Sequence, residues 1–370
     1  MQVTLPPDRA DDSGPPPSAG NALPAGTRIG EFEIKALIGV GGFGIVYLAE
    51  DQLLGRAIAL KEYMPAALAV RQTDGSVAAR SERDAKTFDI GLRSFINEAR
   101  LLAQFDHPAL VKVHRFWEAN GTAYMVMPLY KGVTLRQAVA QLGAPPDEAW
   151  MLHLLAPLTE ALQTIHEQDC LHRDIAPDNI LILENGRPLL LDFGAARQVI
   201  GDATQDLTVI LKPGYAPIEQ YDNGVAIKQG PWTDVYALAA VAYYCATGKT
   251  PAPSVSRAMR DTLVPFSEAT MGRFSPEFCQ AIESAMSVPV EARIQSIAAL
   301  RDVLGLAAGI PHGDTTASVW PRSVSASAGP ITVHGPDEPR LPDADRQFEF
   351  VDRGRKSAEA GGRRRTPWAA

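Results

Sequence analysis

The sequence has few cysteines and no excess of positive charge, and both features limit the classes of protein to which it can belong. Three cysteines occur among 370 residues, Cys170, Cys245 and Cys279, and they lie far apart. Because an odd, scattered set does not form a disulfide framework, we expect a reducing compartment. The formal net charge of −8 argues against nucleic acid or a membrane surface as a partner.

The sequence also lacks a long hydrophobic run. The longest one, "VYALAAVAYYCA" at 235–246, falls short of the roughly 20 residues that a membrane-spanning helix needs, and it predicts a buried core helix. The N-terminus has no basic segment followed by an apolar one, so no signal peptide is expected. With 46% hydrophobic residues the chain can form a core, and we expect a soluble, cytoplasmic protein.

Composition divides the chain into a folded part and two tails. Residues 1–27 and 307–370 are dominated by Pro, Gly, Ser, Ala and Asp and are predicted to be disordered. Within 28–306 the first part reads as strands, such as "EFEIKALIG" and "RAIALKEY", with one helix at 94–105. The later part is mainly helical. The predicted class is α+β, with a small β-rich N-lobe at 28–130 and a larger helical C-lobe at 131–306.

A glycine-rich stretch lies between two of the predicted strands. "LIGVGGFGIVYLA" places Gly39, Gly41 and Gly44 in a G-x-G-x-x-G pattern. Dinucleotide-binding folds share this spacing, and a turn without a ligand is equally compatible with it. A dinucleotide loop opens a helix, however, whereas "IVYLAE" is a strand sequence. A glycine hairpin lets backbone N–H groups lie over a triphosphate, with Phe43 and Val46 capping the phosphates and the adenine face.

Lys61 ends the next strand, where a lysine is ordinarily only solvated. Glu98 changes this interpretation because it shares the apolar face of the 94–105 helix with Phe95 and Leu102. A buried carboxylate is costly unless it is paired. We therefore expect an ion pair between Glu98 and Lys61, which would hold the α- and β-phosphates.

A second polar cluster follows in "LHRDIAPDNILILENGRPLLLDFG" at 171–194. Asn185-Gly186 predicts a tight hairpin, which would bring Asp192 beside the loop that carries Asp174 and Asn179. Phosphoryl transfer needs a metal that bridges phosphates and a carboxylate that orients the attacking hydroxyl. Asn179 and Asp192 offer hard oxygen ligands for Mg²⁺, and Asp174 can accept the proton. Three polar residues in turns without a shared role are the alternative.

Taken together, these motifs resemble the catalytic domain of eukaryotic-like serine/threonine protein kinases of the bacterial type. The resemblance extends to "PGYAPIEQY" at 213–221, to "WTDVYALA" around Asp234, and to Arg293 as the partner of Glu219. It implies a two-lobed kinase fold, ATP and Mg²⁺ as cofactors, protein substrates and Met127 as gatekeeper. The nucleotide-binding positions that it implies are Ile38, Gly39, Val40, Gly41, Gly42, Phe43, Gly44, Ile45, Val46, Ala59, Lys61, Glu98, Pro128, Tyr130 and Asn179.

The sequence departs from the kinase pattern at three places. Ala176 replaces the lysine that steadies the γ-phosphate, Lys212 replaces a threonine, and A-P-E is stretched to "APIE". We hypothesise that Lys212 supplies the missing charge and so acts as a catalytic residue. The alternative is a solvated loop lysine. The chain from 64 to 92 also looks like an insertion, with a hairpin at Asp74-Gly75.

The segment 192–219 contains two threonines, Thr204 and Thr208. In kinases of this type, the arginine beside the catalytic aspartate, here Arg173, commonly binds a phosphate group in this segment. We therefore expect autophosphorylation at one or both threonines. Transfer in trans would require two chains to associate. Two other functions stay open. A nucleotide-binding pseudokinase scaffold is supported by Ala176, and a small-molecule phosphotransferase is disfavoured by the peptide-docking segment "PGYAPIEQY".

Overall fold

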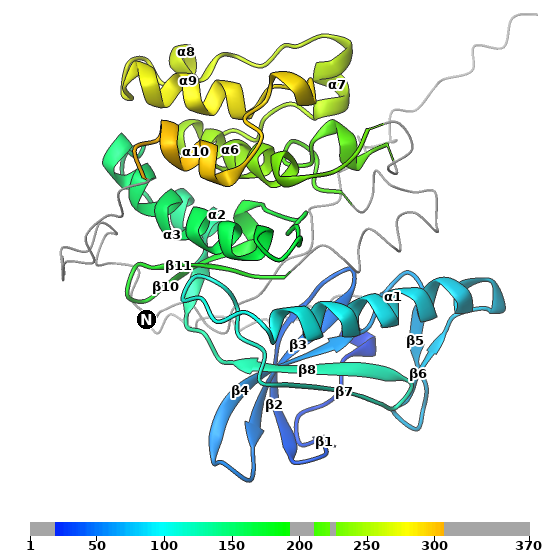
Figure 1. Cartoon of the computed structure of the whole chain (residues 1–370). Helices are drawn as coiled ribbons and strands as arrows, with labels where there is room; N and C mark the ends of the chain where they lie inside the picture. The colour runs from blue at the N-terminus through cyan, green and yellow to red at the C-terminus, as the bar shows by residue number, and fades with distance from the viewer. Residues whose placement is uncertain (1–18, 193–210, 223–226, 307–370) are drawn as a thin grey trace, which may run out of the picture. The chain divides into compact units, whose positions relative to one another are not determined.

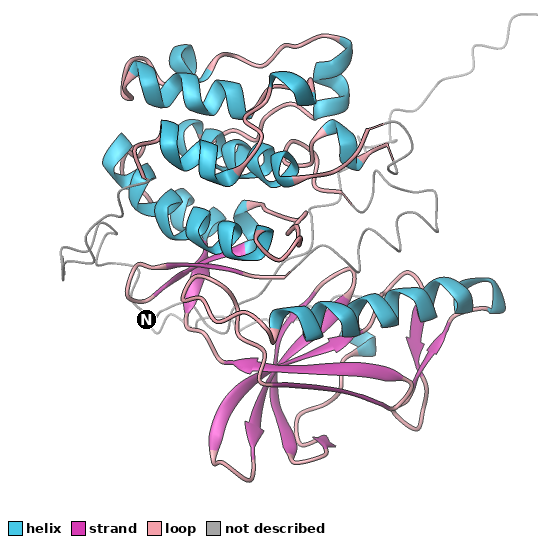
Figure 2. Ribbon diagram, in the orientation of Figure 1, coloured by secondary structure: helices cyan, strands magenta, loops and turns pink. Residues whose placement is uncertain are grey.

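The computed structural model describes residues 19–192, 211–222 and 227–306. A β-rich lobe is followed along the chain by a helical lobe (Figures 1 and 2), which confirms the predicted α+β class and the order of the two lobes. Within these ranges no helix is long and apolar enough to cross a bilayer. Most of the two predicted tails lies outside the described residues.

The N-lobe is built on a sheet of six antiparallel strands in the order β1-β2-β3-β4-β8-β7. Their bounds are Arg28–Ile29 for β1, Phe32–Val40 for β2, Gly44–Asp51 for β3, Arg56–Tyr63 for β4, Arg115–Ala119 for β7 and Thr122–Pro128 for β8. Successive side chains of a strand point to opposite faces of the sheet. The side chains of neighbouring residues such as Lys61 and Glu62 therefore lie on opposite faces of the sheet.

One long helix of the N-lobe, α1 (Glu82–Leu102), is longer than predicted. The sequence placed it at 94–105, but it begins at Glu82 because the Ser81 side chain caps it by accepting from the N–H of Asp84. The added turns bury Phe88, whose ring lies 5.3 Å from that of Tyr63. Packing against the sheet thus extends the helix beyond the stretch with clear apolar spacing.

The predicted insertion contains the hairpin expected at Asp74-Gly75. Its strands are β5 (Ala69–Arg71) and β6 (Val77–Ala79), and Gly75 has a positive φ of 86° in the turn. Residues 19–27, which the sequence analysis assigned to the N-terminal tail, are ordered by contacts with the hairpin, where Arg71 donates to Asn21, and with β3. Leu23 of this segment is buried and its N–H donates to the Tyr47 hydroxyl. Composition could not reveal this contact, because its partners are distant in sequence.

The C-lobe is helical and is centred on α6 (Pro231–Thr247), in which 14 residues from Thr233 to Ala246 are buried. This confirms the core helix predicted at 235–246. The other helices in the described part of this lobe are α2 (Leu135–Ala140), α3 (Glu148–His166), α7 (Ser254–Met259), α8 (Phe266–Ala269), α9 (Pro276–Ala285) and α10 (Ile297–Val303). Short 3-10 helices lie at Ala19–Asn21, Pro177–Asn179, Ile218–Gln220 and Val290–Ala292.

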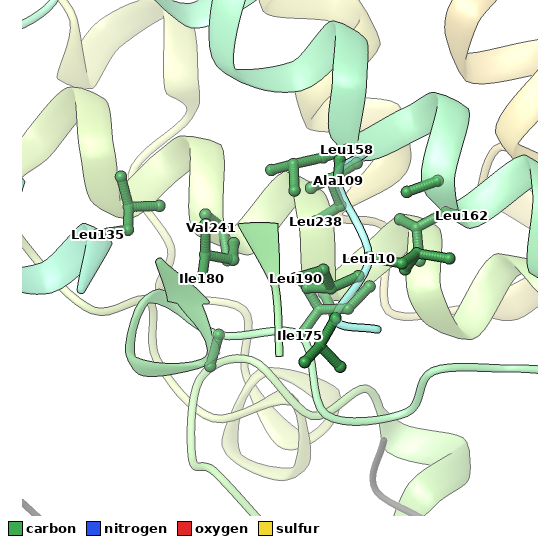
Figure 3. Packing of buried hydrophobic residues seen from close by; sticks show 14 of the residues in the cluster. Ala109, Leu110, Leu135, Leu158, Leu162, Ile175, Ile180, Leu190, Leu238 and Val241 are labelled. Atoms are coloured by element: carbon green, nitrogen blue, oxygen red, sulfur yellow. The ribbon is translucent and has the colours of Figure 1, made fainter. Parts of the chain in front are cut away.

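A small sheet of order β11-β10-β9 carries the site-bearing loops. Its strands are β9 (Gly132–Thr134), β10 (Ile180–Leu183) and β11 (Pro188–Leu190). The β10–β11 turn is the hairpin predicted at Asn185-Gly186, with Gly186 at φ 80°. Figure 3 shows Leu190 and Ile180 packed with side chains of α3 and α6, such as Leu158 and Val241. This core fixes where the chain leaves β11, and hence the position of Asp192.

Candidate active site

One pocket is lined by residues of both lobes and of the segment that joins them. Its lining comprises Ile38, Gly39, Gly41, Gly42, Phe43, Gly44, Val46, Ala59, Lys61, Phe95, Glu98, Val111, Met127, Pro128, Leu129, Tyr130, Asp178, Asn179, Leu181, Leu191 and Asp192. Apolar members come from strands of both lobes, from α1 and from the connecting segments. The charged members lie on β4, on α1, just before β10 and just after β11. Such a cleft, apolar with a few convergent polar groups, is typical of a small-molecule site.

Two of the predicted nucleotide-binding residues do not line this pocket. Ile45 is 1% exposed and belongs to the hydrophobic core, because its neighbours Gly44 and Val46 occupy the pocket-facing side of β3. Val40, its cross-strand partner, is likewise absent from the lining. The resemblance covered the whole loop, whereas the side chains of Val40 and Ile45, which pair across β2 and β3, are not part of the pocket lining.

The structure adds residues that the sequence analysis did not assign to the pocket. They are Phe95, Val111, Leu129, Asp178, Leu181 and Leu191. Phe95 carried a usable signal, since it lies three residues before Glu98 on the same helical face. Leu181 and Leu191 could not be separated from other core leucines by pattern alone.

The glycine loop forms the turn of the β2–β3 hairpin. The N–H of Gly41 donates to the carbonyl of Gly44 at 2.8 Å. A Cβ at Gly44 would lie 2.5 Å from the carbonyl oxygen of Glu62, whereas one at Gly42 would meet nothing within 4 Å. Gly44 is thus required for the close packing of β3 against β4. At Gly42, in contrast, the space beside the backbone is empty.

Lys61 is held between two carboxylates. Its Nζ lies 2.6 Å from Asp192 Oδ1 and 3.8 Å from Glu98 Oε1. Glu98 is 2% exposed and the Lys61 side chain 12%, so the predicted Lys61–Glu98 pair is present and lies in a region of low dielectric, where charges interact strongly. The additional contact with Asp192 joins the β4 lysine to the end of β11.

Asp174 and Asn179 are linked within one loop. The Asn179 side-chain amide donates to the backbone carbonyl of Asp174 at 2.8 Å and also to its carboxylate. The N–H of Leu191 donates to the Asn179 carbonyl at 2.8 Å, which fastens the residue before Asp192 to the loop. The hairpin therefore brings Asp192 beside this loop, as the sequence predicted.

Lys212 reaches the same loop from the segment after the undescribed residues 193–210. Its Nζ lies 3.8 Å from Asp174 Oδ1, and its side chain is 20% exposed. Ala176 is fully buried and contributes no charge. Among the described residues, Lys212 thus supplies the positive charge that lies 3.8 Å from the Asp174 carboxylate.

Buried groups beneath the loop hold its backbone in place. Asp234 of α6 accepts from the N–H groups of His172 and Arg173, both at 2.8 Å, and lies 2.8 Å from His166 Nε2. Although burial by itself raises the pKa of Asp234, the hydrogen bond and charge of His166 lower it below its usual range. Arg173 has a positive φ of 66°. Sequence analysis named Asp234 only as part of a motif and missed the contribution of His166.

His172 has a structural role in this loop. Its Nε2 donates to the Leu191 carbonyl at 2.9 Å, and its Nδ1 accepts from the N–H of Asp174 at 3.3 Å. Both contacts require a neutral imidazole, because Nδ1 must keep its lone pair. Burial lowers the pKa of His172, only partly offset by the charges of Asp234 and Asp174.

The peptide-docking segment is anchored by an ion pair. Arg293 Nη1 lies 2.6 Å from Glu219 Oε1, and both side chains are fully buried, which confirms the pairing predicted for these two residues. The next residue, Gln220, donates to the Arg173 carbonyl at 2.8 Å. The stretched "APIE" thus still delivers its glutamate to Arg293, and it ties the segment to the loop of Asp174.

The residues in the pocket fit a nucleotide and a divalent cation. Lys61 supplies a cation for phosphates, and Asn179 and Asp192 offer amide and carboxylate oxygens to the same cavity. In the described part of the chain, no group of three or more His, Cys, Asp or Glu side chains could hold a metal by itself. Mg²⁺ is commonly bound by one or two carboxylates together with substrate phosphates.

A pocket between a β-lobe and a helical lobe, with this arrangement of charges, is the architecture of protein kinases. A model of the protein kinase domain family matches residues 32–302, and the chain belongs to this family. Its relatives place it with the serine/threonine kinases of bacteria. Members of the family use ATP and a divalent metal ion and act on proteins.

Named relatives give the extent of the similarity. Serine/threonine-protein kinase pkn2 of Myxococcus xanthus is 33% identical over 229 residues, 60% of this chain and 25% of its own length. PrkC of Bacillus subtilis is 30% identical over 265 residues, 70% of this chain and 37% of its own. The match thus covers well under half of either relative's own length.

Solved structures show the same fold. The structure named "PpkA-294 apo form" is 50% identical, with a TM-score of 0.71, and the match covers 77% of this chain and 99% of that one. The kinase domain of Mycobacterium tuberculosis PknI is 22–24% identical, with TM-scores of 0.55–0.58, and supports the fold alone.

Proposed function

We propose that this chain transfers the γ-phosphate of ATP to serine or threonine hydroxyls of proteins. The observation that carries the proposal is the convergence of Lys61, Glu98, Asn179 and Asp192 on one pocket, with the carboxylate of Asp174 hydrogen-bonded to Asn179 at its edge. A pseudokinase scaffold has no evident need for a base together with both metal ligands.

Each polar residue has a distinct role in this proposal. Asp174 orients the acceptor hydroxyl and accepts its proton. Asn179 and Asp192 would hold Mg²⁺, which would supply positive charge to offset that of the phosphates. Lys61, steadied by Glu98, would hold the α- and β-phosphates. The glycine loop from Ile38 to Val46 would cover the triphosphate, and Ala59, the Pro128 carbonyl and the Tyr130 N–H would receive adenine.

Lys212 is proposed to replace the lysine that is missing at 176. Its ammonium lies 3.8 Å from Asp174 Oδ1, which supports a position beside the acceptor hydroxyl and the transferred phosphoryl group. A cation aimed at charge that develops during the reaction typically contributes about 10²–10³ in rate. The alternative, a lysine exposed in a loop, agrees poorly with a side chain that is only 20% exposed.

The remaining parts of the proposal concern regulation and location. Thr204 and Thr208, which lie outside the described residues, are proposed as autophosphorylation sites read by Arg173, through self-association of two chains. The three cysteines are free thiols, which supports a reducing, cytoplasmic location. Domain limits of 28–130 and 131–306 remain part of the proposal, with residues 19–27 added to the N-lobe.

Intact-protein mass spectrometry tests the proposed reaction. Phosphatase-treated protein is incubated with Mg²⁺ and ATP beside the Asp174→Asn variant. Mass steps of one phosphate in the wild type alone would support phosphotransfer to protein. If neither protein gains mass while ATP still raises the melting temperature of both, the scaffold function would replace the proposal.

A further inference from the structure

Two neighbouring residues of β4 form ion pairs of opposite polarity. Lys61 Nζ lies 3.8 Å from Glu98 Oε1 of α1, and Glu62 Oε2 lies 2.5 Å from Nη2 of Arg71 in the β5–β6 hairpin. Because successive side chains leave opposite faces of a strand, these pairs hold β4 from both sides. Figure 1 shows β5 and β6 beside the sheet at one end of α1.

Glu62 is the centre of a buried network on the face opposite Lys61. Its fully buried carboxylate accepts from the hydroxyls of Tyr47 and Tyr124, at 2.8 and 3.0 Å, as well as from Arg71. Burial, followed by the charge of Glu62, raises the pKa of Tyr124 to about 12. The carboxylate is thus hydrogen-bonded by three side chains, as a buried charge requires.

Arg71 connects this network to two other segments. Its Nε donates to the Asn21 carbonyl at 2.7 Å and its Nη1 to the Gly75 carbonyl at 2.9 Å. The side chain is only 8% exposed. Burial by itself lowers the pKa of Arg71, but the hydrogen bond with Glu62 raises it above its ordinary value. The guanidinium therefore fixes the hairpin turn and the N-terminal segment to β4.

The same hairpin leads directly into α1. β6 ends at Ala79, and α1 begins at Glu82 after the Ser81 cap. The N–H of Val77 in β6 donates to the Asn120 carbonyl, in the turn between β7 and β8, at 2.8 Å. Because so few residues connect hairpin and helix, α1 has little room to move while the hairpin stays docked.

We propose that Arg71 is a positioning residue for phosphoryl transfer: by tying the hairpin to Glu62, it holds α1 where Glu98 reaches Lys61. The two ion pairs close a loop of chain that starts at β4, passes through the hairpin and α1, and returns to β4. Arg71 is not among the pocket-lining residues, so it acts through the Lys61–Glu98 pair. The inference rests on the proposed kinase activity.

The test needs a variant that does not leave a charge buried alone. Arg71→Met by itself would strand the Glu62 carboxylate, which can unfold a protein, so the combined Glu62→Gln/Arg71→Met change is used. Arg80→Met is the matched control, because Arg80 follows the same hairpin, is exposed, and donates to the carbonyls of Ala66 and Ala69. Initial rates of phosphate transfer to a generic protein substrate, casein, are measured against ATP concentration.

In the combined variant, kcat/KM for ATP should fall at least tenfold, at a temperature where circular dichroism shows a folded protein. Amides of α1 around Glu98 should exchange hydrogen faster, and Arg80→Met should change neither quantity. Adding the combined change to Glu98→Gln should cause little further loss of rate, because Arg71 acts through Glu98. If the combined variant unfolds, Arg71→Lys keeps the charge but loses donors, and a smaller loss of the same kind is expected.

An unchanged kcat/KM and unchanged α1 exchange in a folded variant would overturn the inference. So would losses that multiply fully when the changes are combined with Glu98→Gln. Wild-type protein without any phosphate transfer would instead overturn the proposed function. In that case hydrogen exchange of α1 would still decide whether Arg71 holds the helix, so the two failures are distinguishable.

Discussion

Lys212→Ala removes the cation that lies 3.8 Å from Asp174 Oδ1, in a chain whose catalytic loop has alanine at 176. At an effective dielectric constant of about 20, two unit charges at this distance interact by about 4 kcal/mol. Solvent around the partly exposed Lys212 side chain lowers that figure. Deleting one charge-stabilising group from an active site typically costs about 10²–10³ in kcat. We therefore expect kcat to fall by about 10².

The assay measures initial rates of ³²P transfer from ATP to casein at saturating ATP, so that kcat is separated from KM. Lys212→Arg keeps the positive charge and should retain most of the activity. Lys228→Ala removes an exposed lysine of the same lobe and should behave as wild type. Melting curves by circular dichroism show that each variant is folded.

A Lys212→Ala variant with wild-type kcat would refute the compensation argument, since the charge would then have no function in the transition state. A raised KM for ATP with unchanged kcat would also contradict it. That result would indicate uniform binding of the nucleotide and no contribution specific to phosphoryl transfer.

Three further outcomes are expected. Asn179→Ala should raise the Mg²⁺ concentration that gives half-maximal rate by about tenfold or more, whereas Asn185→Ala, in the exposed hairpin turn, should leave it unchanged. Arg293→Met should lower the free energy of unfolding in urea by about 3–5 kcal/mol, because it leaves the buried Glu219 carboxylate without a counter-charge; Glu219→Gln/Arg293→Met should lose less. Burial lowers the pKa of His172 in the folded state, so the unfolded state binds this proton at a higher pH, from its ordinary pKa of 6.5 downward; stability should therefore fall by up to about 1.4 kcal/mol per pH unit below that value.

Specific results would contradict these expectations. An unchanged Mg²⁺ requirement in Asn179→Ala would remove that residue from the metal site. Equal losses of stability in the single and double Arg293 variants would show that the stranded charge is not the cause. For His172, unfolding in urea is compared at pH 7.5 and 5.5, and a His172→Asn variant with the same pH dependence as wild type would exclude this histidine as the source.

The sequence by itself predicted the order of the motifs and the chemistry that they offer. The glycine hairpin, Asp174 with Asn179, and the Asn185-Gly186 turn are each contained in one short segment. Their geometry depends on local backbone preferences and turn residues, which a sequence displays directly. The same holds for α6, whose uninterrupted apolar run can only be buried.

The tertiary structure alone decided which residues from distant segments meet. Ile45 belongs to the core and not to the pocket, because packing determines which face of β3 is turned inward. Residues 19–27 are ordered because Arg71, far along the chain, binds Asn21. Lys212 and Asp174 approach each other through the end of a segment whose path no local pattern predicts. Contacts of this kind depend on the summed packing of many elements, and composition or spacing within one element does not encode them.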